Sequence, residues 1–93
     1  MRTIERSSKF KKDYRRESKG KHQIILDEIL TATLTYLVND EDLETRYQDH
    51  NLSGNWDCYR ECHIKPDLLL IYSKPSKDVL RLARMGSHSE LFN

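Results

Sequence analysis

The chain has 93 residues, enough for one small domain and too few for two independent cores. Hydrophobic residues make up 37% of it, charged residues 33%, and the net charge is +1; the clustering of the apolar residues argues against disorder. No stretch approaches the roughly 18 consecutive apolar residues of a membrane-spanning helix, and the N-terminus lacks the apolar segment of a signal peptide. We therefore expect one cytoplasmic domain over residues 1–93, with no membrane partner.

The first half of the chain predicts a strand and two helices. Residues 2–6 form a short candidate strand, and a serine after them caps a helix that ends near Gly20. Phe10 and Tyr14 lie four residues apart on the apolar face of this helix. A second helix is predicted over residues 21–38, where apolar residues recur at helical spacing. The same helix is rich in basic residues: Lys9, Lys11, Lys12, Arg15 and Arg16.

The second half changes to the alternation of strands. Residues 56–64, 68–72 and 79–85 predict three strands joined by short turns that contain proline. Short turns require antiparallel pairing, and the wholly apolar segment 68–72 is expected at the centre of the sheet. Gly86 ends the last strand and leaves residues 87–93 as a tail. The predicted fold is α+β, with two helices on one face of a small sheet and the other face open.

Two cysteines lie in the first of these strands. On one strand, Cys58 and Cys62 would be separated by ~13 Å, beyond the ~7 Å between Cα atoms that a disulfide allows. The segment is not helical in pattern, so the spacing does not suit a metal site. We expect two structural thiols.

The charges are segregated along the chain. Residues 1–24 hold nine Lys/Arg against three Asp/Glu, whereas residues 25–50 hold one against seven. A basic end suits phosphate groups and an acidic end suits a basic partner. A solvated surface would carry the same charges, and the charge pattern alone favours that interpretation.

Three of the four histidines lie in the second half, each near the end of a predicted element: His50, His63 and His88. These side chains can converge on the open sheet face. Two imidazoles can share the proton transfers of phosphodiester cleavage, one from the ribose 2′-hydroxyl and one to the departing 5′-oxygen. Arg84 could stabilise the negative charge of the transition state, and Asp67 could fix an imidazole tautomer or transfer a proton itself.

Other uses of these side chains remain open. A histidine at the end of an element is more often plain polar surface, and three of them bring the two interpretations to even weight. No closely spaced His/Cys pair of the structural zinc type is present, so we expect no metal. Trp56, Tyr59 and Phe92 could stack on bases, although strand aromatics more often pack in a core. Tyr47 and Tyr72 are expected to be packing residues.

Three motifs carry a family resemblance. The loop of residues 47–56 reads YQDHNLSGNW, residues 59–72 read YRECHIKPDLLLIY, and residues 84–92 read RMGSHSELF. In combination they resemble the YafQ branch of the RelE/ParE toxin superfamily. The N-terminal strand and two helices fall in the same order, so the resemblance covers essentially the whole chain.

The resemblance implies a RelE-like fold and a toxin of a type II toxin–antitoxin system. Such toxins are ribosome-dependent endoribonucleases that cleave mRNA in the A site without metal or other cofactor, by attack of the 2′-hydroxyl. Leu68 stands where some relatives carry an aromatic residue, so base stacking from that position is absent and codon preference can differ. The implied catalytic residues are His50, His63, Asp67 and His88, with Arg84 at the phosphate and Phe92 near the base.

The resemblance also implies partners. These are a cognate small antitoxin, the ribosome with its mRNA, and operator DNA reached only through the antitoxin. The acidic stretch 40–44 could belong to the antitoxin-facing surface. Two alternatives remain: a ParE-type toxin that inhibits gyrase, and a non-catalytic module that binds an antitoxin or nucleic acid. The basic residues expected on RNA are Lys9, Lys11, Lys12, Arg15 and Arg16.

Overall fold

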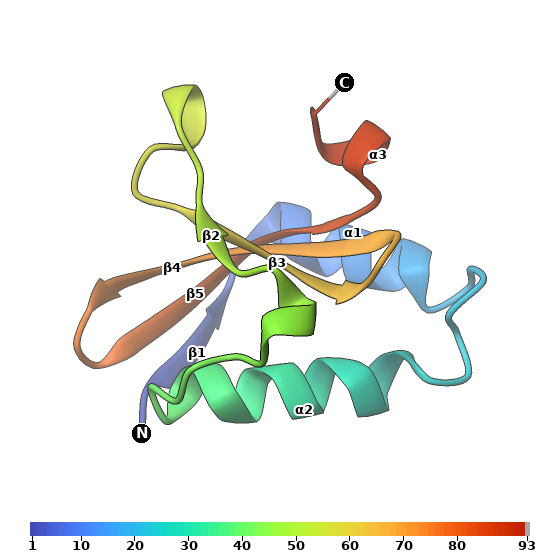
Figure 1. Cartoon of the computed structure of the whole chain (residues 1–93). Helices are drawn as coiled ribbons and strands as arrows, with labels where there is room; N and C mark the ends of the chain where they lie inside the picture. Colours follow the sequence, from blue (N-terminus) through green and yellow to red (C-terminus); the bar gives the residue numbers. More distant parts are fainter. Residues whose placement is uncertain (93) are drawn as a thin grey trace.

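The computed structural model describes residues 1–92 as a five-stranded sheet with three helices (Figure 1). The elements, in chain order, are β1 (Thr3–Arg6), α1 (Ser8–Glu17), α2 (Leu26–Val38), η1 (Thr45–Tyr47), β2 (His50–Asn51), η2 (Gly54–Trp56), β3 (Arg60–Lys65), β4 (Leu68–Ser76), β5 (Val79–Gly86) and α3 (His88–Phe92), where η1 and η2 are single 3₁₀ turns. None of the helices in this part of the chain combines the length and apolar character needed to cross a bilayer.

The strand order in the sheet is β1-β5-β4-β3-β2. Strands β2 to β5 pair antiparallel, whereas β1 pairs parallel to β5 at the other edge. The predicted meander of three strands is therefore confirmed, with β4 at its centre. The short strand β2 extends this meander. Two residues are too few to show an alternating pattern, so the sequence does not predict β2.

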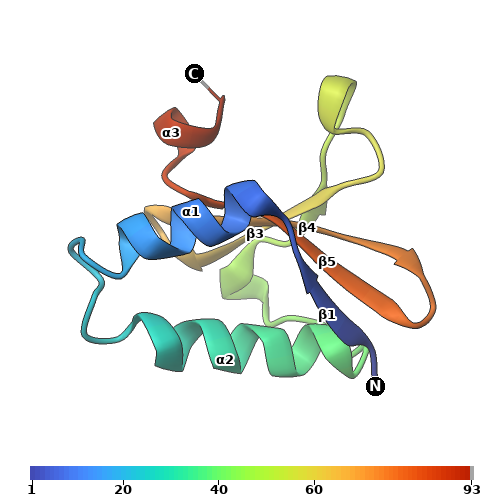
Figure 2. The ribbon, with the colours of Figure 1, turned by 180° about the vertical axis from the view of Figure 1, so that it is seen from behind.

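The main core lies between the sheet and the first two helices. Phe10 of α1 and Leu26 and Leu37 of α2 pack against Leu70 and Tyr72 of β4, and all five side chains are buried. Each such burial stabilises the fold by roughly 1.5–3 kcal/mol. Figure 1 shows α2 below the sheet, and Figure 2 shows α1 beside β1 and β5 from behind. The predicted α+β arrangement is confirmed.

The first hairpin strand begins at Arg60, so the expectation of a strand from Trp56 is wrong. Gly54 has φ 66° and opens the turn η2, and Cys58 has φ 78°, so both residues depart from the extended conformation of a strand before β3 begins. The residues of this turn happen to alternate in polarity, as the residues of a strand do, and this alternation explains the wrong prediction. Cys58 is exposed and Cys62 is fully buried, both as free thiols. Burial raises the pKa of the Cys62 thiol, which suits a packing role.

The two main helices are shorter than predicted. Helix α1 ends at Glu17 rather than near Gly20, and α2 begins at Leu26 rather than at residue 21. The segment between them forms turns. Its residue His22 reaches across to the β3–β4 turn and contacts Asp67. A tertiary contact thus replaces the helical turns that local periodicity favours.

The face expected to be open is partly covered. Residues 87–93 were expected to be a tail, but His88–Phe92 form α3, on the side of the sheet opposite α2 (Figures 1 and 2). The Ser87 hydroxyl accepts the Glu90 N–H at 3.2 Å and the Glu90 carboxylate accepts the Ser87 N–H at 2.8 Å, a capping box. Leu91 then packs on a second, small apolar cluster with Leu69, Ile71 and Ala83. Asn93 lies outside the described residues.

Candidate functional site

The strand register brings the predicted histidines to one face of the sheet. His50 of β2 pairs with Glu61 of β3, which pairs with Ile71 of β4, which pairs with Arg84 of β5. Directly paired residues share a face, and Ile71 belongs to the small cluster under α3. This row therefore faces away from the main core. His63 follows two residues after Glu61 and takes the same face.

The third histidine is brought near the same end of the sheet by the next row. His63 pairs with Leu69, and Leu69 pairs with Gly86 at the end of β5. His88 begins α3 only two residues after Gly86, and α3 lies over this face. Histidines that are distant in the sequence thus border one surface, because the end of β3, the start of β4 and the end of β5 are paired side by side.

A buried carboxylate lies between two of the histidines. The Glu61 side chain is only 7% exposed, and its Oε1 atom lies 3.8 Å from His50 Nε2 and 3.4 Å from His63 Nε2. The other ring nitrogen of His50 donates to the Gln48 carbonyl at 2.8 Å, which fixes its tautomer. His50 is 52% exposed and His63 is 23% exposed. The sequence analysis did not identify Glu61 as a site residue. Its position two residues before His63, which puts both on one face of a strand, is the signal that could have indicated it.

An aromatic cluster borders the site on the α3 side. The His88 and Phe92 rings lie 5.0 Å apart, and Phe92 meets Trp56 at 6.4 Å. Trp56 in turn contacts Tyr59 edge to face at 5.3 Å. These rings pack on the small cluster, yet each of Trp56, Tyr59 and Phe92 stays half-buried. They are therefore both packing groups and accessible surfaces.

Arg84 is held by a buried aspartate of α1. Asp13 is 3% exposed and accepts Arg84 Nε at 2.7 Å and Nη2 at 3.1 Å, together with the Met85 N–H at 3.0 Å. Burial raises the pKa of Asp13, but these hydrogen bonds outweigh it and keep the pKa below its usual value. Within residues 1–92, Nη1 of Arg84 has no hydrogen-bond partner, so the guanidinium is fixed along one edge only.

Arg16 joins three elements instead of standing free on the basic helix. It bonds the Asp13 carboxylate at 3.0 Å and the Met85 carbonyl at 2.9 Å, and it pairs with Glu90 of α3 at 3.2 Å. A Cβ atom at Gly86 would lie 2.7 Å from Arg16 Nη2, so a side chain at this position would displace the end of the Arg16 side chain. The other predicted basic residues of α1 are exposed: Lys9, Lys11, Lys12 and Arg15.

Asp67 is engaged away from the three predicted histidines. Its carboxylate contacts Lys21 Nζ at 2.6 Å and His22 Nε2 at 2.8 Å, both from the segment between α1 and α2. The hydrogen bonds from Lys21 and then His22 lower the pKa of Asp67 to about 2. The carboxylate is therefore ionised at neutral pH and ties the β3–β4 turn to that segment.

A polar network anchors the strand that carries His50. Asp49 accepts the Tyr72 hydroxyl at 2.5 Å and Arg60 Nη2 at 3.0 Å, and Arg60 Nη1 also donates to Asn51 at 2.6 Å. Burial and the Asp49 hydrogen bond raise the pKa of Tyr72, so its hydroxyl remains a donor. Tyr47 and Tyr72 are buried, as predicted.

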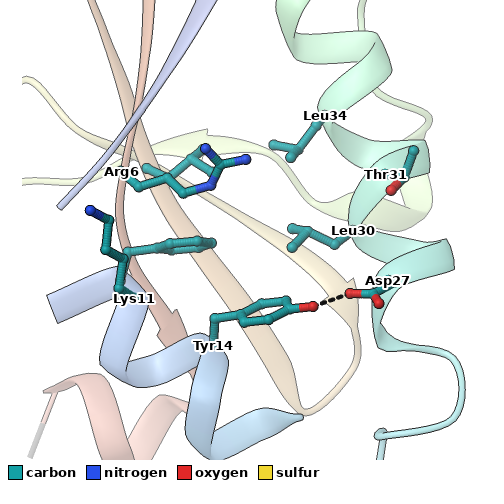
Figure 3. A pocket seen from close by; sticks show the side chains of 9 residues that line it. Arg6, Lys11, Tyr14, Asp27, Leu30, Thr31 and Leu34 are labelled. Atoms are coloured by element: carbon teal, nitrogen blue, oxygen red, sulfur yellow. Dashed lines mark hydrogen bonds between the residues drawn. The ribbon is translucent and has the colours of Figure 1, made fainter. Parts of the chain in front are cut away.

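A separate groove of about 320 Å³ runs between α1 and α2 (Figure 3). Phe10, Leu30 and Leu82 form its buried floor, and the Tyr14 hydroxyl donates to Asp27 across one end. Arg6 and Lys11 border the other side. Within residues 1–92, no group of three His, Cys, Asp or Glu side chains has the arrangement of a metal site.

Residues 2–93 match the sequence family described as a bacterial toxin of type II toxin–antitoxin system, YafQ. The chain belongs to this family. The mRNA interferase toxin YafQ of Escherichia coli K12 is 38% identical over 93 residues, which are 99% of this chain and 97% of the relative. Among solved structures, a copper-bound mutant toxin from Helicobacter pylori has a TM-score of 0.86 at 37% identity, covering 99% of this chain and all of that one. The toxin in the E. coli DinJ–YafQ complex has a TM-score of 0.81 at 33% identity over both full chains.

Proposed function

We propose that the chain is an mRNA-cleaving toxin that acts on ribosome-bound message through His50, His63 and His88. The observation that carries this proposal is the row of paired residues that puts two imidazoles on one oxygen of Glu61, on the sheet face bordered by α3. The E. coli relative named mRNA interferase toxin supports RNA as substrate and favours it over gyrase as the target.

The proposed reaction needs two proton transfers. A neutral imidazole removes the proton of the 2′-hydroxyl, and the 2′-oxygen attacks the adjacent phosphorus. The bond from phosphorus to the 5′-oxygen breaks, and a protonated imidazole gives that oxygen its proton. The products are a 2′,3′-cyclic phosphate and a 5′-hydroxyl. No metal takes part in these steps.

Glu61 supports this chemistry by positioning. Since one carboxylate oxygen contacts both Nε2 atoms, these atoms lie within about 7 Å of each other, a separation suited to the two oxygens on opposite sides of one phosphorus. Imidazoles held in this way lose little entropy on reaching the reactive geometry. Arg84, fixed by Asp13, offers Nη1 to the phosphorane oxygens.

Asp67 and the basic helix have supporting roles in the proposal. Asp67 acts as an ionised anchor for the β3–β4 turn and does not exchange a proton in the reaction. Phe92, beside His88, stacks on a base of the message. Arg16 stabilises the link between α1 and α3. The exposed cations proposed to contact RNA are Lys9, Lys11, Lys12 and Arg15.

The proposal includes neutralisation by a cognate antitoxin, through which alone the toxin reaches operator DNA. The E. coli DinJ–YafQ complex supports a partner of this kind. Two surfaces suit a protein: the groove between α1 and α2, with its apolar floor, and the exposed acids Glu41, Asp42 and Glu44. Asp40 is less available, because Lys74 and Arg2 bind its carboxylate and lower its pKa to about 2.

The direct test maps the 3′ ends of mRNA after brief expression of the toxin, and repeats the mapping with purified ribosomes. We expect new ends within translated codons, carrying a cyclic phosphate, only when ribosomes are present. Cleavage of naked RNA at the same rate would exclude ribosome dependence. Intact mRNA together with gyrase-dependent DNA breaks would favour the alternative toxin class.

A further inference from the structure

A pocket of about 380 Å³ lies beside the row of histidines, and His63 forms part of its wall. This volume lies within the range of small-ligand sites. The pocket is lined by Arg46, Gln48, His63, Ile64, Lys65 and Pro66. We propose that it binds the backbone phosphate of a nucleotide that flanks the cleaved bond, with Arg46 and Lys65 as its ligands. The inference rests on the proposed RNA-cleaving function.

The pocket is cationic, although the segment of the sequence that contributes Arg46 is acidic. Arg46 is the single Lys or Arg of residues 25–50, a segment that holds seven Asp or Glu. Yet none of the residues lining the pocket is acidic, and Lys65 adds a second cation from the end of β3. The lining thus offers donors from Arg46, Gln48 and Lys65, which suit an anion.

Arg46 is preorganised for a phosphate. Its guanidinium carbon lies 4.5 Å from the centre of the Tyr47 ring, and Nη2 donates to the Tyr47 hydroxyl at 3.2 Å. Tyr47 is 3% exposed and packs against Tyr36, so this platform is rigid. Nη2 also contacts Glu44 at 3.4 Å, but both side chains are more than half exposed, and such pairs contribute little. A guanidinium held flat is suited to paired hydrogen bonds with phosphate.

The pocket is continuous with the proposed catalytic centre. His63 lines it while its Nε2 contacts Glu61. Gln48, in the left-handed backbone conformation at φ 49°, lines it too and accepts the His50 Nδ1–H through its carbonyl. A phosphodiester chain that places one phosphate between the imidazoles therefore has a cationic pocket beside it, where the neighbouring phosphate can bind.

The test uses ribosomes programmed with synthetic mRNA that carries one neutral methylphosphonate at each backbone position in turn. Single-turnover cleavage gives the half-saturating ribosome concentration and the maximal rate for the wild-type toxin, Arg46→Gln, Lys65→Gln and the double variant. Lys77→Gln, an exposed lysine of the β4–β5 turn, is the matched control. Melting temperatures verify that each variant is folded.

We expect each pocket variant to raise the half-saturating concentration about five- to tenfold with the maximal rate nearly unchanged, and Lys77→Gln to have no effect. One methylphosphonate next to the cleaved bond should weaken the wild type by the same factor and leave the double variant unaffected. If each methylphosphonate weakened the wild type and the double variant equally at every position, the assignment of the pocket to a backbone phosphate would be wrong. Loss of antitoxin affinity with unchanged RNA parameters would assign the pocket to a protein instead. Absence of wild-type cleavage would contradict the proposed function itself.

Discussion

The two faces of the sheet differ in what their residues do. The face toward α1 and α2 is a continuous apolar core around Leu70 and Tyr72. The opposite face carries the smaller apolar cluster under α3, bordered by His50, Glu61 and His63. Stability should therefore depend on the first face and RNA cleavage on the second. Substitutions on each face test this separation, because each should change one property and leave the other nearly unchanged.

The largest difference between the effect on cleavage and the effect on stability is expected for the histidine substitutions. His50→Ala and His88→Ala should each slow mRNA cleavage on ribosomes by roughly 10²–10⁴-fold, because each removes a general acid or base. Both residues are exposed, so the melting temperature should hardly change. Quench-flow cleavage assays and calorimetry measure the two quantities. Full activity in both variants would refute the assignment of function to this face.

The converse substitution lies in the main core. Leu70→Ala should lower the free energy of unfolding by about 2–5 kcal/mol, because it leaves a cavity beside β4. Molecules that remain folded should cleave at close to the wild-type rate. Urea unfolding gives the stability, and activity is normalised to the folded fraction. A rate loss as large as that of His50→Ala, at full folding, would show that the two faces are not separate.

Asp13 connects the two properties. Asp13→Asn should lower the free energy of unfolding by about 2 kcal/mol, since a buried neutral amide cannot hold both Arg84 and Arg16 as a carboxylate does. It should also slow cleavage, because the Arg84 guanidinium loses its fixed orientation. Unfolding and cleavage are measured on the same samples. An unchanged stability would contradict the described network.

Glu61→Gln should have a smaller effect, about tenfold on the maximal rate. The isosteric amide still fills the buried site but no longer attracts an imidazolium. Ile71→Val, at the neighbouring position in the row, is the packing control. A maximal rate equal to that of the wild type would remove Glu61 from the site.

Asp67→Asn is expected to have the smallest effect. Because the pKa of Asp67 is about 2, its carboxylate is ionised over the whole working range, and both limbs of the pH–rate profile should persist in the variant. The stabilisation it gives is fully present above about pH 4 and is lost as the pH falls through 2. At half exposure this amounts to less than about 1 kcal/mol. Disappearance of one limb would restore Asp67 as a proton-transfer group.

The sequence predicts the features that depend on local periodicity. The alternation over residues 56–64 predicts most of β3, the apolar segment 68–72 predicts the first part of β4, and the family motifs single out the histidines. The turn over residues 56–59 was missed because its residues alternate by chance, and α3 was missed although Ser87 and Glu90 form a readable capping box. The roles proposed for the histidines stay predictions.

Other features of the site could not be predicted, because they are purely tertiary. Asp13 and Arg84 are separated by 71 residues, and His22 and Asp67 by 45. No periodicity relates such pairs. Glu61 becomes visible as a site residue only through the register that pairs it with His50. Arg46 is one cation in an acidic segment, and it is recognised as part of the proposed anion site only because the fold puts Lys65 in the same pocket.

The most direct test is an NMR titration of the four histidine ring resonances with a nucleoside 3′-monophosphate, which resembles the cleaved end of the message. We predict that the resonances of His50, His63 and His88 shift with one common dissociation constant. His22, held by Asp67, should stay in place as the internal reference. Shifts of only one imidazole, or different dissociation constants for the three, would contradict a single phosphate site on this face of the sheet.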